Sequence, residues 1–266
     1  EPMKVADAIA KWEHLKYVVI TCVDRDDLMD FGAVHIKRTV ENVKKIRRKP
    51  VALPGDDEID FEGGSLSSSV LGSSSAASSR KPRSITSEVL VETLLGDFRG
   101  DLKLVDIVLE GNMDVFAHNI ETVDRLNSIV RDRRANYKQS MSVLEHVGNQ
   151  NEKRLRDGKN PIITKSSIIV GLGETDAEIE QTMRDLRSAG CRAVTLGQYL
   201  QPTKKHMRVD RFVPPEVYGE YERMARDMGF DMVASGPMVR SSYRAGELFL
   251  TRLIEKDRES QVAAAL

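Results

Sequence analysis

The 266-residue chain is long enough to bury one substantial core, and α/β barrels of this length commonly fold as a single domain. Its 40 lysine and arginine residues nearly balance 41 aspartate and glutamate residues, so its charge predicts neither a nucleic-acid nor an anionic-membrane partner. No stretch approaches the roughly 18 consecutive apolar residues of a membrane-spanning helix. The start, Glu1-Pro2-Met3-Lys4, is neither a signal nor a transit peptide, and the missing initiator methionine predicts a trimmed chain.

Helical spacing opens the chain, in the pattern Val5, Ala8, Ile9 and Trp12. The apolar run Tyr17-Val18-Val19-Ile20 then predicts a buried strand. From Gly32 a second amphipathic helix is predicted, with its apolar positions at Ala33, Ile36, Val40 and Val43. The basic cluster 44–49 that ends it suits a helix C-terminus and needs no ligand.

Residues 50–87 form a serine-rich insertion, which includes SLSSSVLGSSSAASS. This composition cannot bury enough apolar area to offset the entropy of ordering, so we expect a disordered surface loop. A phosphorylated regulatory tract is the alternative.

Strands and helices alternate through the remainder. The pattern predicts strands at 89–91, 114–117, 162–170, 194–196 and 232–234, and helices from Asp101, around 137–147, from Thr175 to Gly190, and after Pro215. Thr175 and Glu178 have the spacing of a capping box, and Gly190 that of a helix-ending residue. This alternation predicts a parallel sheet wrapped by helices.

Ligands of such sheets bind where the strands end, and here the segments after the strands are polar. They are 21–27, 97–101, 118–122, 171–175 and 197–202. Their shared position predicts one site.

Each polar motif also has a structural interpretation. Gly171-Leu172-Gly173-Glu174 could let backbone approach a ligand or could be an ordinary turn. Asn119 and Glu121 could bind a ribose diol, or serve as a turn residue and a first-turn charge. The cluster Asp24-Arg25-Asp26-Asp27 could hold an amino or carboxylate group or pair with itself.

Metal ligation receives little support from these residues. His118 and His206 lack a third convergent ligand. Cys22 and Cys191 each lie in an apolar run, outside any CxxC or C-x₃-C pattern, so we expect both to be buried, reduced core residues.

Taken in order, six segments resemble the lipoyl synthase family over nearly the whole chain outside the insertion. They are LKYVVITCVDRDDL, LLGDFRGDL, DVFAHNIETV, TKSSIIVGLGETD, TLGQYLQPTKKH and ASGPMVRSSYRAGELF. The resemblance implies one partial (β/α)₆ barrel domain of the radical S-adenosylmethionine type over 1–266, lacking its N-terminal strand and cluster loops, with a C-terminal extension at about 237–266.

The resemblance also implies a reaction. One [4Fe–4S] cluster cleaves S-adenosylmethionine reductively to a 5′-deoxyadenosyl radical, and a second cluster supplies sulfur, so that two sulfur atoms enter at carbons 6 and 8 of a protein-bound octanoyl group. The implied partners are octanoylated lipoyl carrier domains (2-oxoacid dehydrogenase E2 subunits and the glycine cleavage H protein), the iron–sulfur assembly machinery and an electron donor. The ending SYRAGELFLTRL resembles mitochondrial members.

Site residues follow from the resemblance position by position. Thr21 and Asp24 would face the methionyl amino group, and Asn119 with Glu121 the ribose. The segment from Ile169 through Gly171 and Gly173 to Glu174 would flank the adenine, with Gln198 and Tyr199 closing the same side. Lys165 and Arg240 would pair with carboxylate or sulfide groups, and Ser242 would ligate the auxiliary cluster through its hydroxyl oxygen.

The chain also departs from the family. Phe31 stands where the family usually has glycine. The family's cluster cysteines lie upstream of Glu1, so we expect this chain alone to bind little iron and to be inactive. A catalytically silent barrel that only binds a carrier domain or partner is the alternative function. A biotin synthase-like enzyme is a third, against which the Arg-Ser-Ser-Tyr segment argues.

Overall fold

The computed structural model describes residues 1–23, 25–48, 88–242 and 244–264. Asp24 and the insertion expected at 50–87 therefore lie outside the described residues, and their predictions are not tested.

Six parallel strands form one sheet, in the order in which they occur along the chain. They are β1 (Tyr17–Thr21), β2 (Leu90–Leu94), β3 (Val115–Ala117), β4 (Ile163–Val170), β5 (Ala193–Gln198) and β6 (Met232–Gly236). Within the described residues β1 and β6 are the two edges of this sheet. The expected α/β architecture of a partial barrel is confirmed.

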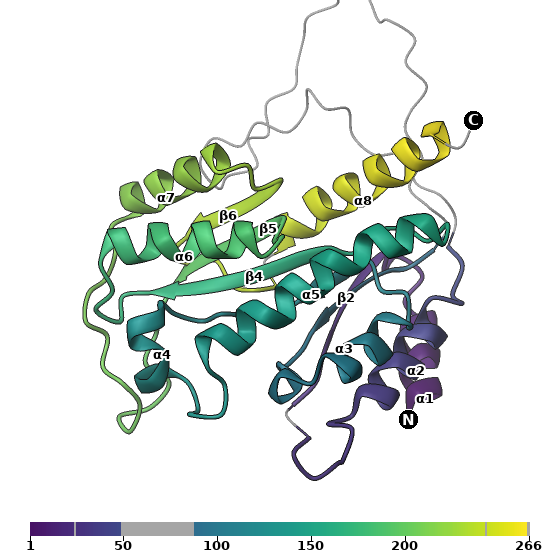
Figure 1. The fold of residues 1–266 in the computed structure, drawn as a ribbon, viewed down its shortest axis with the longest axis horizontal. Coiled ribbons are helices and arrows are strands. Elements are labelled where there is room, and N and C mark those ends of the chain that lie inside the picture. Colours follow the sequence, from purple (N-terminus) through teal and green to yellow (C-terminus); the bar gives the residue numbers. More distant parts are fainter. Residues whose placement is uncertain (24, 49–87, 243, 265–266) are drawn as a thin grey trace, which may run out of the picture.

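Helices connect the strands, because a parallel neighbour can be reached only by a crossover. The connecting helices are α2 (Ala33–Val43), α3 (Leu102–Leu109), α4 (Asp124–Val130), α5 (Tyr137–Arg156), α6 (Asp176–Ser188) and α7 (Pro215–Asp227), with a 3₁₀ turn at Phe98–Gly100. Helix α1 (Pro2–Ala10) precedes β1, and α8 (Arg244–Ala264) follows β6 (Figure 1). No helix in these ranges has the length and apolar character needed to cross a bilayer.

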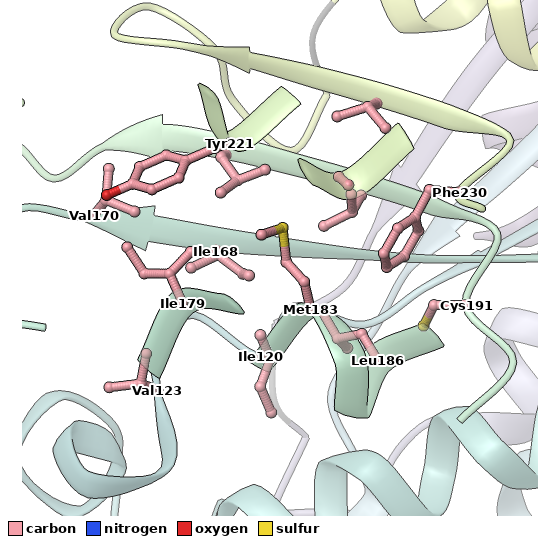
Figure 2. Close-up of a cluster of buried hydrophobic side chains, with 14 of the residues drawn as sticks. Ile120, Val123, Ile168, Val170, Ile179, Met183, Leu186, Cys191, Tyr221 and Phe230 are labelled. Carbon is pink, nitrogen blue, oxygen red and sulfur yellow. The ribbon is translucent and has the colours of Figure 1, made fainter. Parts of the chain in front are cut away.

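Alternate residues of each strand face two different cores. On the outer face, Ile168 and Val170 of β4 pack against Ile179 and Met183 of α6, as Figure 2 shows. On the inner face, Tyr17, Leu90, Ile163 and Met232 pack with Leu250, Leu253 and Ile254 of α8. Helix α8 therefore covers the inner face of the sheet.

Ion pairs join α8 to residues that lie just before the first residues of two strands. Asp114, just before β3, accepts hydrogen bonds from Arg258 of α8 at 2.7 Å and from Lys44 at 2.8 Å. Arg192, just before β5, pairs with Asp257 of α8. These ion pairs hold α8 near the amino ends of the strands, and the polar loops lie at the carboxyl ends.

The helical predictions held where periodicity was strong. All four predicted apolar positions of α2 are buried, and the Thr175–Glu178 capping box forms. Two details differ from the predictions. Helix α1 ends at Ala10, so Trp12 of the predicted helical pattern lies beyond it and is 64% exposed, and the buried residues of α1 are Ala6 and the predicted Ile9. Cys22 is only half-buried because β1 ends at Thr21, whereas Cys191 is buried as expected.

Candidate active site at the carboxyl edge of the sheet

The carboxyl ends of all six strands lie at one edge of the sheet, because every neighbouring pair is parallel. We call this edge, with the five segments 21–27, 97–101, 118–122, 171–175 and 197–202, the rim. The expected convergence of the polar segments follows from this topology. Thr21 ends β1 at the rim with an exposed side chain, and Ile169 lies half-buried near the end of β4.

The charged cluster after β1 pairs within the protein. Arg25 donates to Asp27 at 2.8 and 2.7 Å. Asp26 accepts from Arg99 at 3.1 Å and from Arg134 at 2.6 Å, which joins two rim segments to the turn before α5. The described residues of the cluster therefore form a paired network, and the binding of an amino or carboxylate group, which this network does not exclude, stays a prediction.

Beside this network is a pocket with strained walls. Its lining residues are Cys22, Val23, Arg25, Asp26, Phe31, Ile36, Leu95, Gly96, Asp97, Phe98, Arg99, Asp132, Arg134 and Ala135. Phe31, Phe98 and Arg99 adopt left-handed φ angles of 49°, 50° and 53°. Non-glycine residues rarely take such angles unless the surroundings enforce them. The Arg99 guanidinium lies 4.9 Å from the centre of the Phe31 ring and so stabilises that loop.

Asn119 and Glu121 come together at the rim after β3. The Asn119 amide donates to the Glu121 carboxylate at 3.1 Å. The Glu121 backbone adopts φ 66° and is bonded to β4 on both sides, through Ser167 at 3.0 Å and Ile169 at 2.8 Å. This pair presents amide and carboxylate groups from a fixed backbone, as recognition of a diol requires. Burial raises the pKa of the Glu121 carboxyl, although the Asn119 hydrogen bond opposes this.

We expect Glu121→Gln to stabilise the chain increasingly as the pH rises. A carboxyl whose pKa is raised by folding binds its proton more tightly in the folded state, so its contribution to stability falls as the pH rises above about 4.3, the ordinary glutamate pKa. The amide keeps an oxygen for Asn119 and cannot ionise. Thermal unfolding of both forms between about pH 5 and 8 measures this trend. As a control, Glu110→Gln should show almost no trend over this range, because Lys37 lowers the pKa of Glu110 and the contribution of that carboxylate changes only below about pH 4.3. A pH-independent difference for Glu121→Gln would contradict the prediction.

The glycine turn after β4 is held by its own glutamate. Glu174 is buried and accepts from the backbone N–H groups of Gly171 at 2.6 Å and Leu172 at 2.8 Å. Gly171 has φ 100°, and a side chain there would collide with Gln198 and with the Arg211 carbonyl. Gly173 also has a left-handed φ, 97°. The turn therefore brings bare backbone to the rim, while Glu174 fixes its shape and uses two of its N–H donors.

Gln198 and Tyr199 fix the long loop that follows β5. The Gln198 side chain is buried on the outer face, donates to the carbonyls of Val170 and Arg211, and accepts from the Val213 N–H at 2.9 Å. The Tyr199 hydroxyl donates to the Met207 carbonyl at 2.8 Å. In this structure both side chains position the loop.

The Lys165 side chain points into the barrel and pairs with Glu92, a residue that no sequence motif indicated. Its ammonium donates to the two oxygens of Glu92 at 2.8 and 3.0 Å, and the Tyr17 hydroxyl donates to the same carboxylate at 2.5 Å. The Lys165 and Glu92 side chains are only 4% and 1% exposed. The charge expected to meet a cofactor carboxylate is thus already neutralised by Glu92. A lone acid within the buried strand Leu90–Leu94 was the signal that could have revealed this pair.

The segment after β6 folds back over the sheet. A side chain at Gly197 would collide with the Val239 carbonyl, so glycine is required there. Arg240 is exposed and donates to the same Val239 carbonyl at 2.7 Å. Ser242 is exposed two residues before α8 begins. The structure therefore brings Arg240 to the rim beside β5. Ser242 follows two residues later with an exposed side chain, and its expected role as a cluster ligand remains a prediction.

Histidines and cysteines do not assemble a metal centre in the described residues, which hold no group of three suitable ligands. His118 is buried, with its ring nitrogens 2.8 Å from the Leu95 carbonyl and from the Ser140 hydroxyl. Cys22 follows the carboxyl end of β1, whereas Cys191 precedes the amino end of β5. The two thiols thus lie at opposite edges of the sheet.

Known proteins with closely similar sequences share one name. Over 98% of this chain, "Lipoyl synthase, mitochondrial" of Candida albicans is 42% identical and that of Drosophila mojavensis is 43% identical. The protein of that name from Saccharomyces cerevisiae is 45% identical over 96% of this chain. These matches cover 55%, 58% and 50% of the respective relatives, so the chain spans about half the length of the curated relatives it matches. No protein-family model matches the chain.

Proposed function

We infer, because this chain belongs to the lipoyl synthase family, that its protein inserts two sulfur atoms at carbons 6 and 8 of a protein-bound octanoyl group. The observation that carries this inference is identity above 40% over nearly the whole chain, which includes every segment of the rim. The relatives carry a mitochondrial name, and we propose the same location for this protein.

The rim residues fit S-adenosylmethionine. Asn119 and Glu121 can donate to and accept from a ribose diol. Thr21 lies at the end of β1, where the methionyl end would bind. When bound, S-adenosylmethionine would supply the radical that activates the octanoyl carbons.

The described residues do not by themselves fit an iron–sulfur cluster. A [4Fe–4S] cluster normally takes three or four thiolates, and the chain has two cysteines, at opposite edges of the sheet. We therefore assign no step to the clusters. The expectation that the ligand cysteines lie outside this chain, and that the chain alone is inactive, remains a prediction.

The chain's own residues position the reactants and exclude water. The Asn119–Glu121 pair and the Glu174-braced turn are held on rigid strand ends, so a bound adenosyl group would be held in one orientation. Packing of α8 on the inner face closes the opposite end of the barrel to solvent. Arg240 and Ser242 would complete the site from the segment folded over β5.

Octanoylated carrier domains are the proposed substrates, with an iron–sulfur assembly system and an electron donor as further partners. A silent barrel that only binds such a domain is not favoured, because the relatives named above carry the name of the enzyme.

The test is anaerobic incubation of the reconstituted full-length protein with S-adenosylmethionine, a reductant and an octanoylated carrier domain. Mass spectrometry of the modified lysine should show two added sulfur atoms. An Asn119→Ala/Glu121→Ala variant should lose S-adenosylmethionine cleavage and sulfur insertion together. If the wild-type protein cleaves S-adenosylmethionine and leaves the octanoyl group unchanged, the assigned reaction is wrong.

A further inference from the structure

An exposed basic turn lies in the loop between β5 and α7. Within the turn Thr203–Arg208, Lys204, Lys205, His206 and Arg208 are all exposed. The loop begins where β5 ends at Gln198, so the turn projects from the rim. Two large apolar side chains flank it, Leu200 at 50% exposure and Phe212 at 73%.

Hydrogen bonds hold this turn in one shape. The Gln201 amide donates to the His206 carbonyl at 2.7 Å, and the His206 N–H donates to the Thr203 carbonyl at 3.0 Å. The Thr203 hydroxyl lies 2.9 Å from Nδ1 of His206 and accepts from the Lys205 N–H. With Tyr199 bonded to Met207, the loop is tied at both its base and its tip. The positions from which the cations project are thus fixed before any partner binds.

The cations of this turn differ from the arginines around them. Arg25, Arg99, Arg125, Arg134 and Arg211 each form an ion pair with a carboxylate. Within the part of the chain that the structure describes, Lys204, Lys205 and Arg208 have no carboxylate at ion-pairing distance. The chain otherwise balances its charges, with a net charge of -1. A rigid, unpaired basic group at the mouth of a site is the feature that an anionic partner complements.

We propose that the basic turn docks an acidic surface of the carrier domain that presents the octanoyl group. Three fixed cations with apolar neighbours match a small mixed patch on a protein, whereas nucleic acid requires a longer basic track than this turn provides. Complementary charge mainly speeds the encounter of two proteins and sets their register, so the turn would orient the octanoyl group toward the rim. This inference rests on the proposed function, since that function defines the carrier.

The test compares two triple charge reversals in the full-length protein. Lys204→Glu/Lys205→Glu/Arg208→Glu should slow association with an octanoylated carrier domain by about tenfold or more in stopped-flow or surface-binding measurements. The wild-type affinity should fall steeply as salt rises from roughly 0.05 to 0.5 M, and that of the variant should not. The matched control is Lys11→Glu/Lys45→Glu/Lys159→Glu. These residues are exposed near the amino ends of the strands, and reversing them should leave association nearly unchanged.

A short octanoyl-lysine peptide separates docking from chemistry. Both triple variants should modify this peptide as the wild type does, because it lacks the acidic surface. An unaltered association rate of the 204/205/208 variant with the domain would overturn the docking proposal, and so would equal loss on peptide and domain. Tighter binding of the wild type to anionic lipid vesicles than to the carrier would also overturn it. Failure of the wild type to modify either substrate would instead refute the proposed function.

Discussion

Replacing Glu92 with alanine should destabilise the chain by about 3–5 kcal/mol, the cost of leaving one partner of a buried ion pair uncompensated. The Lys165 ammonium, 4% exposed, would lose both of its carboxylate contacts, and the Tyr17 hydroxyl would lose its acceptor. For a domain of this size the midpoint of thermal unfolding should fall by roughly 10 °C. Glu180→Ala is the matched control. Its carboxylate pairs with Arg184 on the exposed face of α6 and should contribute less than about 1 kcal/mol.

A double replacement separates the stability of this pair from its function. Glu92→Leu with Lys165→Met removes both charges of this pair together, and such exchanges are often neutral or stabilising by roughly 1–4 kcal/mol. We expect the double variant to unfold near the wild-type midpoint. If it also keeps wild-type S-adenosylmethionine affinity, the expected cofactor role of Lys165 is wrong. If Glu92→Ala alone costs under about 1 kcal/mol, the pair is not the buried contact described here.

Hydrophobic periodicity predicted the helices that cover the outer face of the sheet, because their apolar side chains repeat wherever they pack on the strands. Val40 and Val43 of α2 repeat at helical spacing since they pack on the outer face of the sheet, and both are fully buried. The parallel sheet followed from the alternation of strands and helices, because parallel neighbours need crossovers. The ends of the elements were less predictable. Cys22 was expected to be buried but lies just after the end of β1 and is only half-buried, and the helix predicted to include Trp12 ends at Ala10.

The polar contacts inside the barrel depend on pairs that no local pattern reveals. Glu92 and Lys165 are 73 residues apart, and only the sheet register brings them together. Gln198 was expected near the adenine, but it binds carbonyls of the loop after β5, which has no regular period. Asn119 and Glu121 were found because they sit two residues apart directly after a strand. The sequence therefore indicated the polar segments of the rim well, but it did not indicate the hydrogen bonds and ion pairs that hold those segments in place.

The segment that follows β6 provides the second large expected effect. Gly197, whose missing side chain lets the Val239 carbonyl lie against β5, fixes the start of this segment. Val239 is buried with α8 on the inner face, while Ser242, three residues further on, is exposed.

In the full-length protein, Ser242→Ala should lower lipoyl formation about a hundredfold or more while S-adenosylmethionine cleavage stays measurable. An alanine side chain has no oxygen to offer to iron, whereas the Asn119–Glu121 pair that would hold the adenosyl group is untouched. Cleavage and lipoyl formation are followed in the same reaction by chromatography and mass spectrometry, and iron content is measured beforehand. Ser241→Ala, a neighbouring change on the same segment, is the control and should retain both activities. Ser242→Cys should keep the iron content of the wild type, since a thiolate is the stronger iron ligand. Wild-type lipoyl yield from Ser242→Ala would refute the role, because a side chain that would bind the auxiliary cluster could not be removed without loss of lipoyl formation.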